Sequence, residues 1–229
     1  MQYQLPVFEN LCPGWQKILY LGIRRAFVKG TRILDMDTPL NGVYLVKDGV
    51  VEVILNTLHG PEKVLYYVGP GCIFGEVSCF TGDDGGEAHV SARSDCVCYF
   101  FSREQIEGLI SNQHPYLLIE LIRAEAHKIR MYGVLLQDSL NSDHFMRVCK
   151  MIIYLVRFKG GPIGPDQQQV SFRPEMTQND MARLMGVHRV TVTKAISRLK
   201  RLGVLSHFSK NALEIIDYPA LCRLLQAEN

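Results

Sequence analysis

Two kinds of hydrophobic spacing divide this chain. Between residues 27 and 101, short runs rich in β-branched and aromatic residues alternate with turn residues. These runs predict strands at Val43–Val46, Val50–Leu55, Lys63–Val68, His89–Arg93 and Cys96–Phe101. Lys47–Gly49 and Leu58–Pro61 read as turns between them. Short strands with turn signals roughly every 8–12 residues are typical of a sandwich or barrel.

A long helix is predicted after Pro115, where apolar positions recur at intervals of four and three. One stripe consists of Leu117, Leu121, Ala124, Lys128, Met131 and Leu135. The adjacent stripe consists of Leu118, Ile122, Ile129, Tyr132 and Leu136. We expect one stripe to pack on the β domain and the other to face a second copy of the helix, giving a homodimer. The alternative is a single long helix against one domain.

The segment from Met176 to Leu202 predicts two short helices joined by a glycine turn. Thr177 is a good N-cap, and Asp180 three residues later completes a capping-box pattern. Gly186 ends the first helix, and a second begins near His188 with Val192, Ala195, Ile196 and Leu199 on its inner side. This is a helix-turn-helix, whose second helix enters the DNA major groove.

The flanking segments extend this prediction to a winged domain. Ser139–Asp143 reads as a polar hinge, and Ser142 or Asp143 can cap a helix over His144–Phe158. After the helix-turn-helix, Val204–Ile216 fits a two-stranded wing. We therefore expect an α+β chain with a β domain, a sandwich or barrel, at 1–110, a dimerisation helix and hinge at 111–139, and a winged helix-turn-helix at 140–229.

Charge is distributed unevenly along the chain. Residues 140–229 carry 13 Lys or Arg against 7 Asp or Glu, a net +6, and the remainder carries 12 against 16, a net −4. Between Met181 and Lys210 there are seven basic residues and no acidic ones. A basic C-terminal module on an acidic N-terminal one indicates that the C-terminal end meets nucleic acid. The alternative reading is a solvated amphipathic helix pair.

Composition narrows the remaining classes. No signal-peptide pattern and no apolar run near the roughly 20 residues that span a bilayer is present, so we expect a cytoplasmic protein without a membrane partner. The seven cysteines have no repeating spacing and should mostly be thiols. Cys96 and Cys98 point to one face of a strand, as a metal or redox pair or as core packing. No catalytic or metal-binding constellation stands out, so we expect neither an enzyme nor a cofactor.

A glycine-punctuated β roll, a long helix, a hinge and a winged helix-turn-helix, in that order, resemble the Crp/Fnr superfamily of bacterial transcription regulators. The sharpest matches are YLVKDGVVEV, PGCIFGE and the helix-turn-helix, and the resemblance covers essentially the whole chain. It implies a cyclic-nucleotide-binding-like domain, a homodimer, a palindromic double-stranded DNA site, RNA polymerase as a partner, and a small effector.

The resemblance argues against cyclic AMP as that effector. Gly75 and Glu76 match the Gly-Glu of the phosphate-binding segment, but Gly86 and Glu87 occupy the positions of its Arg-Ser pair. A carboxylate in place of the phosphate-binding cation is repulsive. The iron–sulfur members need several N-terminal cysteines, and only Cys12 is available. Haem sensing stays open, with His59, His89, His114 and His127 as possible axial ligands.

A closer likeness is to the halorespiration regulators, which sense halogenated phenols. The shared residues are EKVLYYVG, FGE, TG, the Lys in AHKIRMY, and GVHRVTV. The likeness implies that Lys128 pairs with an aromatic anion and that Tyr66 lines its pocket. Burying an ammonium in an apolar stripe requires such an anion, unless Lys128 snorkels or pairs with Glu125 of a partner helix. The chain departs from those sensors at Glu76, where they carry lysine, and at Glu125, where they carry tyrosine.

The family resemblance also assigns DNA contacts. Base contacts fall on Arg189, Val190 and Lys194, and contacts nearer the phosphates fall on His188, Thr191, Thr193, Thr177, Gln178 and Asn179. Val190 cannot accept a hydrogen bond but can contact a thymine methyl, which predicts a palindrome richer in A·T at that step. The likeness to the halorespiration regulators implies a site of the TTAAT-N4-ATTAA kind. The competing hypothesis is a redox-responsive regulator switched through Cys12 or the Cys96–Cys98 pair without a ligand.

Overall fold

The computed structural model describes residues 6–35, 40–56, 60–81, 88–160 and 168–226. These residues form two compact units. The N-terminal unit comprises Pro6–Leu58 and Val64–Tyr132, and the C-terminal unit comprises Gly133–Asn229 with short earlier segments. The boundary falls inside the long helix α4 (Tyr116–Asn141), so each unit is described on its own.

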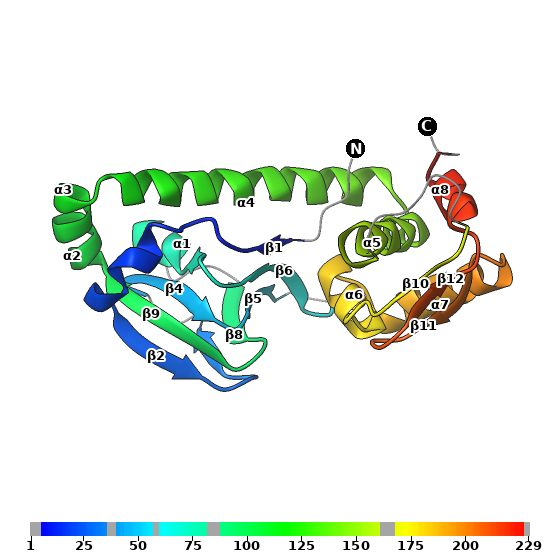
Figure 1. Ribbon diagram of the computed structural model, residues 1–229, viewed down its shortest axis with the longest axis horizontal. Coiled ribbons are helices and arrows are strands. Elements are labelled where there is room, and N and C mark those ends of the chain that lie inside the picture. Colours follow the sequence, from blue (N-terminus) through cyan, green and yellow to red (C-terminus); the bar gives the residue numbers. More distant parts are fainter. Residues whose placement is uncertain (1–5, 36–39, 57–59, 82–87, 161–167, 227–229) are drawn as a thin grey trace. The chain divides into compact units, whose positions relative to one another are not determined.

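Two β-sheets build the N-terminal unit (Figure 1). The five-stranded sheet has the order β1 (Val7–Phe8), β6 (Lys63–Val68), β5 (Val51–Leu55), β8 (Ala88–Ala92) and β3 (Arg32–Leu34). The four-stranded sheet has the order β2 (Ile23–Phe27), β9 (Cys96–Ser102), β4 (Gly42–Asp48) and β7 (Ile73–Phe74). The predicted strands are therefore present. The turn predicted at Lys47–Gly49 is shorter than expected, because Lys47 and Asp48 belong to β4 and only Gly49, at φ +80°, and Val50 separate it from β5.

Short helices complete the N-terminal unit. They are the 3-10 helix η1 (Trp15–Leu21), α1 (Glu76–Thr81), α2 (Arg103–Gln105), the π-helix η2 (Ile106–Ile110) and α3 (Ser111–Gln113). Neither η1 nor the strands before residue 43 follow from the hydrophobic spacing alone. The cap of α2 is a capping box, because the side chains of Ser102 and Gln105 each bond the other's backbone N–H.

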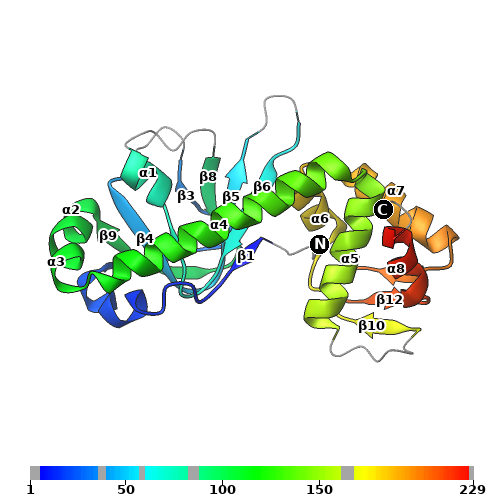
Figure 2. The same ribbon diagram turned by 90° about the horizontal axis from the view of Figure 1, so that it is seen from above.

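The buried stripe of α4 closes the core of this unit. Leu117, Leu121 and Ala124 pack with Trp15, Phe101 and neighbouring apolar side chains of the roll. The Trp15 indole N–H donates to the carbonyl oxygen of Leu117 at 3.0 Å. These contacts fix the first half of α4 against the roll. Figure 2 shows this part of the helix running across the strands. The prediction that one helical stripe packs on the β domain is correct for these residues.

The C-terminal unit is a winged helix-turn-helix. Its elements are α5 (His144–Lys159), β10 (Val170–Phe172), α6 (Gln178–Met185), α7 (Arg189–Arg201), β11 (Leu205–Phe208), β12 (Leu213–Ile215) and α8 (Tyr218–Gln226). The wing strands β11 and β12 are as predicted. β10 joins them as a third antiparallel strand, with Val170 opposite Ile215. Helix α8 had no sequence prediction.

The hinge is shorter than predicted. Helix α4 runs through Asn141, so only Ser142 and Asp143 separate it from α5. Asp143 is the N-cap, and its Oδ1 accepts from the backbone N–H of Met146 at 2.7 Å. Ser142 instead accepts from the Lys150 ammonium. Helix-favouring residues up to Leu140 extend the helix beyond the polar signal at Ser139.

Candidate DNA-binding face and effector site

The turn between α6 and α7 is set by local chemistry. The Thr177 hydroxyl accepts from the Asp180 backbone N–H at 3.1 Å, and the Asp180 carboxylate accepts from the Thr177 N–H at 2.9 Å. Gly186 ends α6 in the left-handed region at φ +65°, where a side chain would be strained. Val192, Ala195, Ile196 and Leu199 are buried as predicted, so the opposite face of α7 is exposed.

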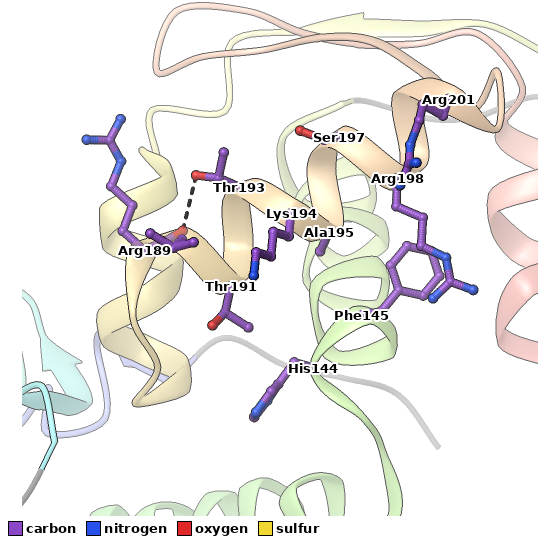
Figure 3. A pocket seen from close by; sticks show the side chains of 11 residues that line it. His144, Phe145, Arg189, Thr191, Thr193, Lys194, Ala195, Ser197, Arg198 and Arg201 are labelled. Carbon is purple, nitrogen blue, oxygen red and sulfur yellow. Dashed lines mark hydrogen bonds between the residues drawn. The ribbon is translucent and has the colours of Figure 1, made fainter.

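The exposed face of α7 borders a basic hollow. The hollow has a volume of about 800 Å³ and is lined by Arg189, Val190, Thr191, Lys194 and other residues of α5 and α7. Val190 is 61 % exposed, so its apolar side chain is available for contact on this face. Figure 3 shows the Thr191 and Lys194 side chains on one side of α7, with the Arg189 side chain extending in a different direction from the start of the helix. The arrangement can approach a polyanion and still present an apolar contact at Val190.

Three of the predicted phosphate contacts already have partners within the protein. Thr193 donates to the Gln178 side-chain oxygen at 2.8 Å, and also contacts the carbonyl oxygen of Arg189 at 3.1 Å. The Thr177 hydroxyl donates to Asp180 at 2.7 Å. The Thr193–Gln178 bond joins α7 to α6, and the Thr177–Asp180 bond belongs to the N-terminal cap of α6. Asn179, His188 and Thr191 remain on or near the surface, with Asn179 and His188 exposed.

Sequence reasoning missed the contribution of α5 to this face. His144 and Phe145 line the hollow together with Arg198 and Arg201. The Arg198 guanidinium lies 3.9 Å from the centre of the Phe145 ring. Figure 3 shows the two side chains side by side. Stacking on an aromatic ring holds a guanidinium in place while leaving its N–H donors available. No local sequence signal links positions 145 and 198, because they meet only through the packing of α5 on α7.

Lys128 forms the centre of a buried charge cluster in the N-terminal unit. Its side chain is 3 % exposed, and its ammonium lies 2.6 Å from Glu76 Oε1 and 2.9 Å from Glu125 Oε1. It also donates to the carbonyl oxygen of Ile73 at 3.2 Å. The alternative that Lys128 snorkels is wrong, because its side chain is buried. Within this chain its charge is compensated by Glu76 and Glu125. Pairing with an external anion or with Glu125 of a partner helix stays a prediction. Both residues that depart from the halophenol sensors are its partners.

The cluster has one positive and two negative groups. Burial lowers the pKa of Lys128, but the Glu76 and Glu125 carboxylates more than offset this and leave that pKa above its ordinary value. Burial, followed by repulsion from Glu76, raises the pKa of Glu125. The cluster therefore keeps its ammonium charged at neutral pH and leaves the two carboxylates in competition for it.

A cavity of about 150 Å³ adjoins this cluster. Its apolar wall includes Leu34, Val53, Leu65 and Val90. Polar groups come from Asp35, Tyr66, Glu76, Ser78 and Tyr132. The Tyr66 and Tyr132 rings meet edge-on, with their centres 5.9 Å apart. Gly75 lines the cavity at φ +90°, and a Cβ there would lie 2.5 Å from a Leu40 methyl carbon. The predicted effector residues Tyr66, Gly75, Glu76 and Lys128 are thus brought together, with Lys128 behind Glu76.

Comparisons with known proteins agree with both units. Residues 24–113 match the cyclic nucleotide-binding domain family, and residues 146–224 match the Crp-like helix-turn-helix domain family. The chain belongs to the Crp/Fnr family of transcription regulators. The matched ranges contain the roll and the helix-turn-helix described above.

Relatives of this Crp/Fnr regulator are regulators, not enzymes. The CRP-like cAMP-activated global transcriptional regulator of Mycobacterium tuberculosis is 27 % identical over 199 residues, covering 86 % of this chain and 85 % of the relative. The cyclic AMP receptor protein of Thermus thermophilus is 27 % identical over 202 residues, with 87 % of each chain covered. A solved structure of CprK complexed with OCPA has a TM-score of 0.77 at 17 % identity, covering 96 % of this chain and 98 % of that one. At that identity the likeness shows the fold.

The thiols of this Crp/Fnr regulator are mostly buried. Burial raises the pKa of Cys12 to about 12 and that of Cys72 to about 11, and it also raises the pKa of Cys96 and Cys98. Thiolates are the reactive form, so these cysteines are poorly suited to oxidation at neutral pH. The redox alternative stays a prediction that the burial of these thiols argues against.

Some of the residues expected to bear on haem or cyclic-nucleotide binding lie outside the described ranges. Gly86, Glu87 and His59 lie outside the described residues. His89 is buried in β8, and His127 is exposed on α4. Within the described ranges, no group of three or more His, Cys, Asp or Glu side chains is placed to hold a metal ion. No helix of the described chain is both long and apolar enough to span a bilayer.

Proposed function

We propose that the chain is a homodimeric regulator that reads an A·T-rich palindrome under the control of a small aromatic effector and acts on RNA polymerase. The effector-sensing roll is assigned to 1–110, the dimerisation helix and hinge to 111–139, and the DNA-binding domain to 140–229. The observation that carries this proposal is the exposed basic face of α7 beside the hollow lined by α5 and α7.

An exposed apolar seam along α4 supports the homodimer. It consists of Ile119, Ile122, Ala126, Ile129, Gly133, Leu136 and Leu140, all exposed and spaced alternately by three and four residues. Such spacing is that of a coiled-coil seam, and Ala126 and Gly133 allow close approach of two helices. Ile129 is 68 % exposed. Leu118 was expected in this seam, but it packs against the core of the roll.

The dimer is tested by placing a charge in the seam. Ile129→Asp should give a monomer in sedimentation velocity and lose tight binding to the palindrome, because a buried carboxylate in the seam would have no partner. His127→Asp introduces the same charge at an exposed position outside the seam and should remain dimeric. An Ile129→Asp variant with the mass of the wild-type dimer would contradict the proposed interface.

The DNA site is tested by fluorescence anisotropy with a TTAAT-N4-ATTAA duplex and a scrambled duplex. We expect preferential binding to the palindrome, with Val190 against a thymine methyl. In a binding-site selection, Val190→Glu should shift the preferred base pair at that step toward G·C, since a carboxylate accepts from cytosine N4. An unchanged base preference would show that Val190 does not contact that step.

The effector is assigned to the cavity beside Glu76. A volume of about 150 Å³ suits one aromatic ring, whereas sites for larger, drug-sized ligands run to about 300–1,000 Å³. Together with Gly86 and Glu87 at the Arg-Ser positions, this size favours a single-ring molecule over cyclic AMP, although several relatives are named as cAMP-activated. A thermal-shift screen of halogenated phenols against cyclic AMP tests the assignment, and stabilisation by cyclic AMP alone would overturn it.

Coupling to DNA is proposed to run through α4 and its junction with α5. In the C-terminal unit, buried Asp138 pairs with Lys150 at 2.6 Å and with Arg147 at 3.5 Å. Arg147 also donates to the carbonyl oxygen of Met185, the last residue of α6, at 3.0 Å. A shift of α4 in its seam therefore has a direct route to the helix-turn-helix. An effector that prefers one arrangement by about 1–3 kcal/mol is enough for regulation.

A further inference from the structure

Beside the effector cavity, the hydrogen-bond donors of Lys128 all have partners, whereas one acceptor oxygen of Glu76 has none in the described part of the chain. An ammonium has three N–H donors, and those of Lys128 are matched by three acceptors: Ile73 O, Glu76 Oε1 and Glu125 Oε1. Glu76 lines the cavity and is 4 % exposed, and its second oxygen, Oε2, has no hydrogen-bond partner among the described residues. The group left to be satisfied at this site is thus an acceptor.

The charge of the site points the same way. Two carboxylates surround one ammonium, so the cluster of Glu76, Glu125 and Lys128 carries a net charge of −1 when all three are ionised. An anion entering the cavity would meet the Glu76 carboxylate before it reached Lys128, in a buried setting where repulsion is weakly screened. A neutral group with a polar hydrogen would instead relieve the unpaired oxygen.

The size and walls of the cavity define the rest of the ligand. An engineered protein cavity of about 150 Å³ lined by aliphatic side chains binds benzene. Here the aliphatic wall comes from four strands, and the Tyr66 and Tyr132 rings supply aromatic surface. One substituted ring fits this volume with its polar substituent at Glu76.

We propose that the cavity binds a single-ring aromatic molecule in its uncharged form, held by a hydroxyl or N–H group that donates to Glu76 Oε2. This inference rests on the proposed effector site and reverses the charge expected from the sequence. Lys128 then acts as a positioning residue, which fixes the Glu76 carboxylate so that one oxygen faces inward and the other is occupied.

Two pairs of probes matched in shape test this proposal by isothermal titration calorimetry on the full chain at pH 7.5. Phenol and toluene differ in the donor, and benzamide and benzoate differ in charge. We expect phenol to bind about 10- to 100-fold more tightly than toluene, the range for a hydrogen bond to a charged acceptor. Benzamide should exceed benzoate by at least the same factor. Equal binding of phenol and toluene, tighter binding of benzoate, or no binding of any probe overturns the proposal.

Glu76→Gln and Glu125→Gln separate the oxygen from the charge. Both remove one negative charge and keep a carbonyl oxygen for Lys128, but only Glu76→Gln replaces the inward acceptor with an N–H donor. Glu76→Gln should reduce or reverse the ratio of the affinity for benzamide to that for benzoate. Glu125→Gln should leave this ratio as it is in the wild type. If Glu76→Gln fails to fold, the wild-type probe series still decides. Binding of the same preparation to the palindrome is measured in parallel, so loss of the ligand inference with DNA binding intact is distinguished from failure of the proposed function.

Discussion

Basic side chains have different roles on α7 and on α4. On α7, Arg189 and Lys194 are exposed, and the hollow they border holds no carboxylate among its lining residues. On α4, Lys128 is buried and surrounded by two carboxylates and a carbonyl oxygen. An exposed, uncompensated charge is free to meet a phosphate or a base, whereas a compensated buried charge fixes the side chains around it. A lysine in a ligand-binding family is therefore not by itself a ligand contact.

The largest expected effect is the loss of stability when the buried ammonium of Lys128 is removed. Lys128→Met leaves Glu76 buried without its ion pair, so we expect the free energy of unfolding to fall by about 3–5 kcal/mol. Lys194→Ala on the exposed face should change it by less than about 0.5 kcal/mol. Urea denaturation followed by circular dichroism measures both. Adding Glu76→Met to Lys128→Met should recover part of the lost stability, because it removes the unpaired carboxylate. Equal stability of Lys128→Met and wild type would show that Lys128 does not form the buried ion pair with Glu76.

The second prediction concerns the exposed basic residues of α7. Arg189→Ala removes a proposed base contact, so affinity for the palindrome should fall by about 1–3 kcal/mol while binding to scrambled DNA changes less. Arg223→Ala is the matched control, because Arg223 is an exposed residue of α8, away from the hollow. Anisotropy titrations at one fixed salt concentration compare them. Equal losses on both duplexes would assign Arg189 to the phosphates.

These two regions also differ in how far sequence could predict them. Short-range sequence signals determine the helix-turn-helix. They all lie within about two dozen residues: the cap formed by Thr177 and Asp180, the turn at Gly186, and the buried positions of α7. The Lys128–Glu76 pair joins residues 52 positions apart, and periodicity could show only that Lys128 lies on the buried side of α4. Its partner depends on how α4 crosses the roll. The stacking of Arg198 on Phe145 and the pairing of β10 with β12 were missed for the same reason.

A third prediction separates the two carboxylates of the cluster. The raised pKa of Glu125 means that the folded chain holds this proton more tightly than the unfolded chain. The stability gained by protonation is therefore present at low pH and is lost as pH rises through the raised pKa. Glu125→Gln mimics the protonated form, so it should raise the unfolding midpoint at pH 7 by about 2–4 °C, the shift that about 1 kcal/mol produces at this chain length.

The control for this effect is Glu107→Gln, because Glu107 is an exposed residue paired with Arg103 outside the cluster. Its profile of midpoint against pH should follow the wild type. The Glu125→Gln profile should be flatter from about pH 4.5 upward. A lower midpoint for Glu125→Gln at pH 7 would mean that the attraction of Lys128 outweighs the repulsion between Glu125 and Glu76.

The smallest expected effects lie at the edge of the exposed face. Lys200 and Lys210 are exposed, and we assign them to phosphates rather than bases. Each Ala substitution should reduce the slope of log affinity against log salt by about 0.9, because one fewer counterion is released. The loss should be the same on the palindrome and on scrambled DNA. Lys29→Ala in the N-terminal unit should leave the slope unchanged. A sequence-dependent loss at Lys200 would extend base reading along α7 beyond Lys194, the last base contact assigned there.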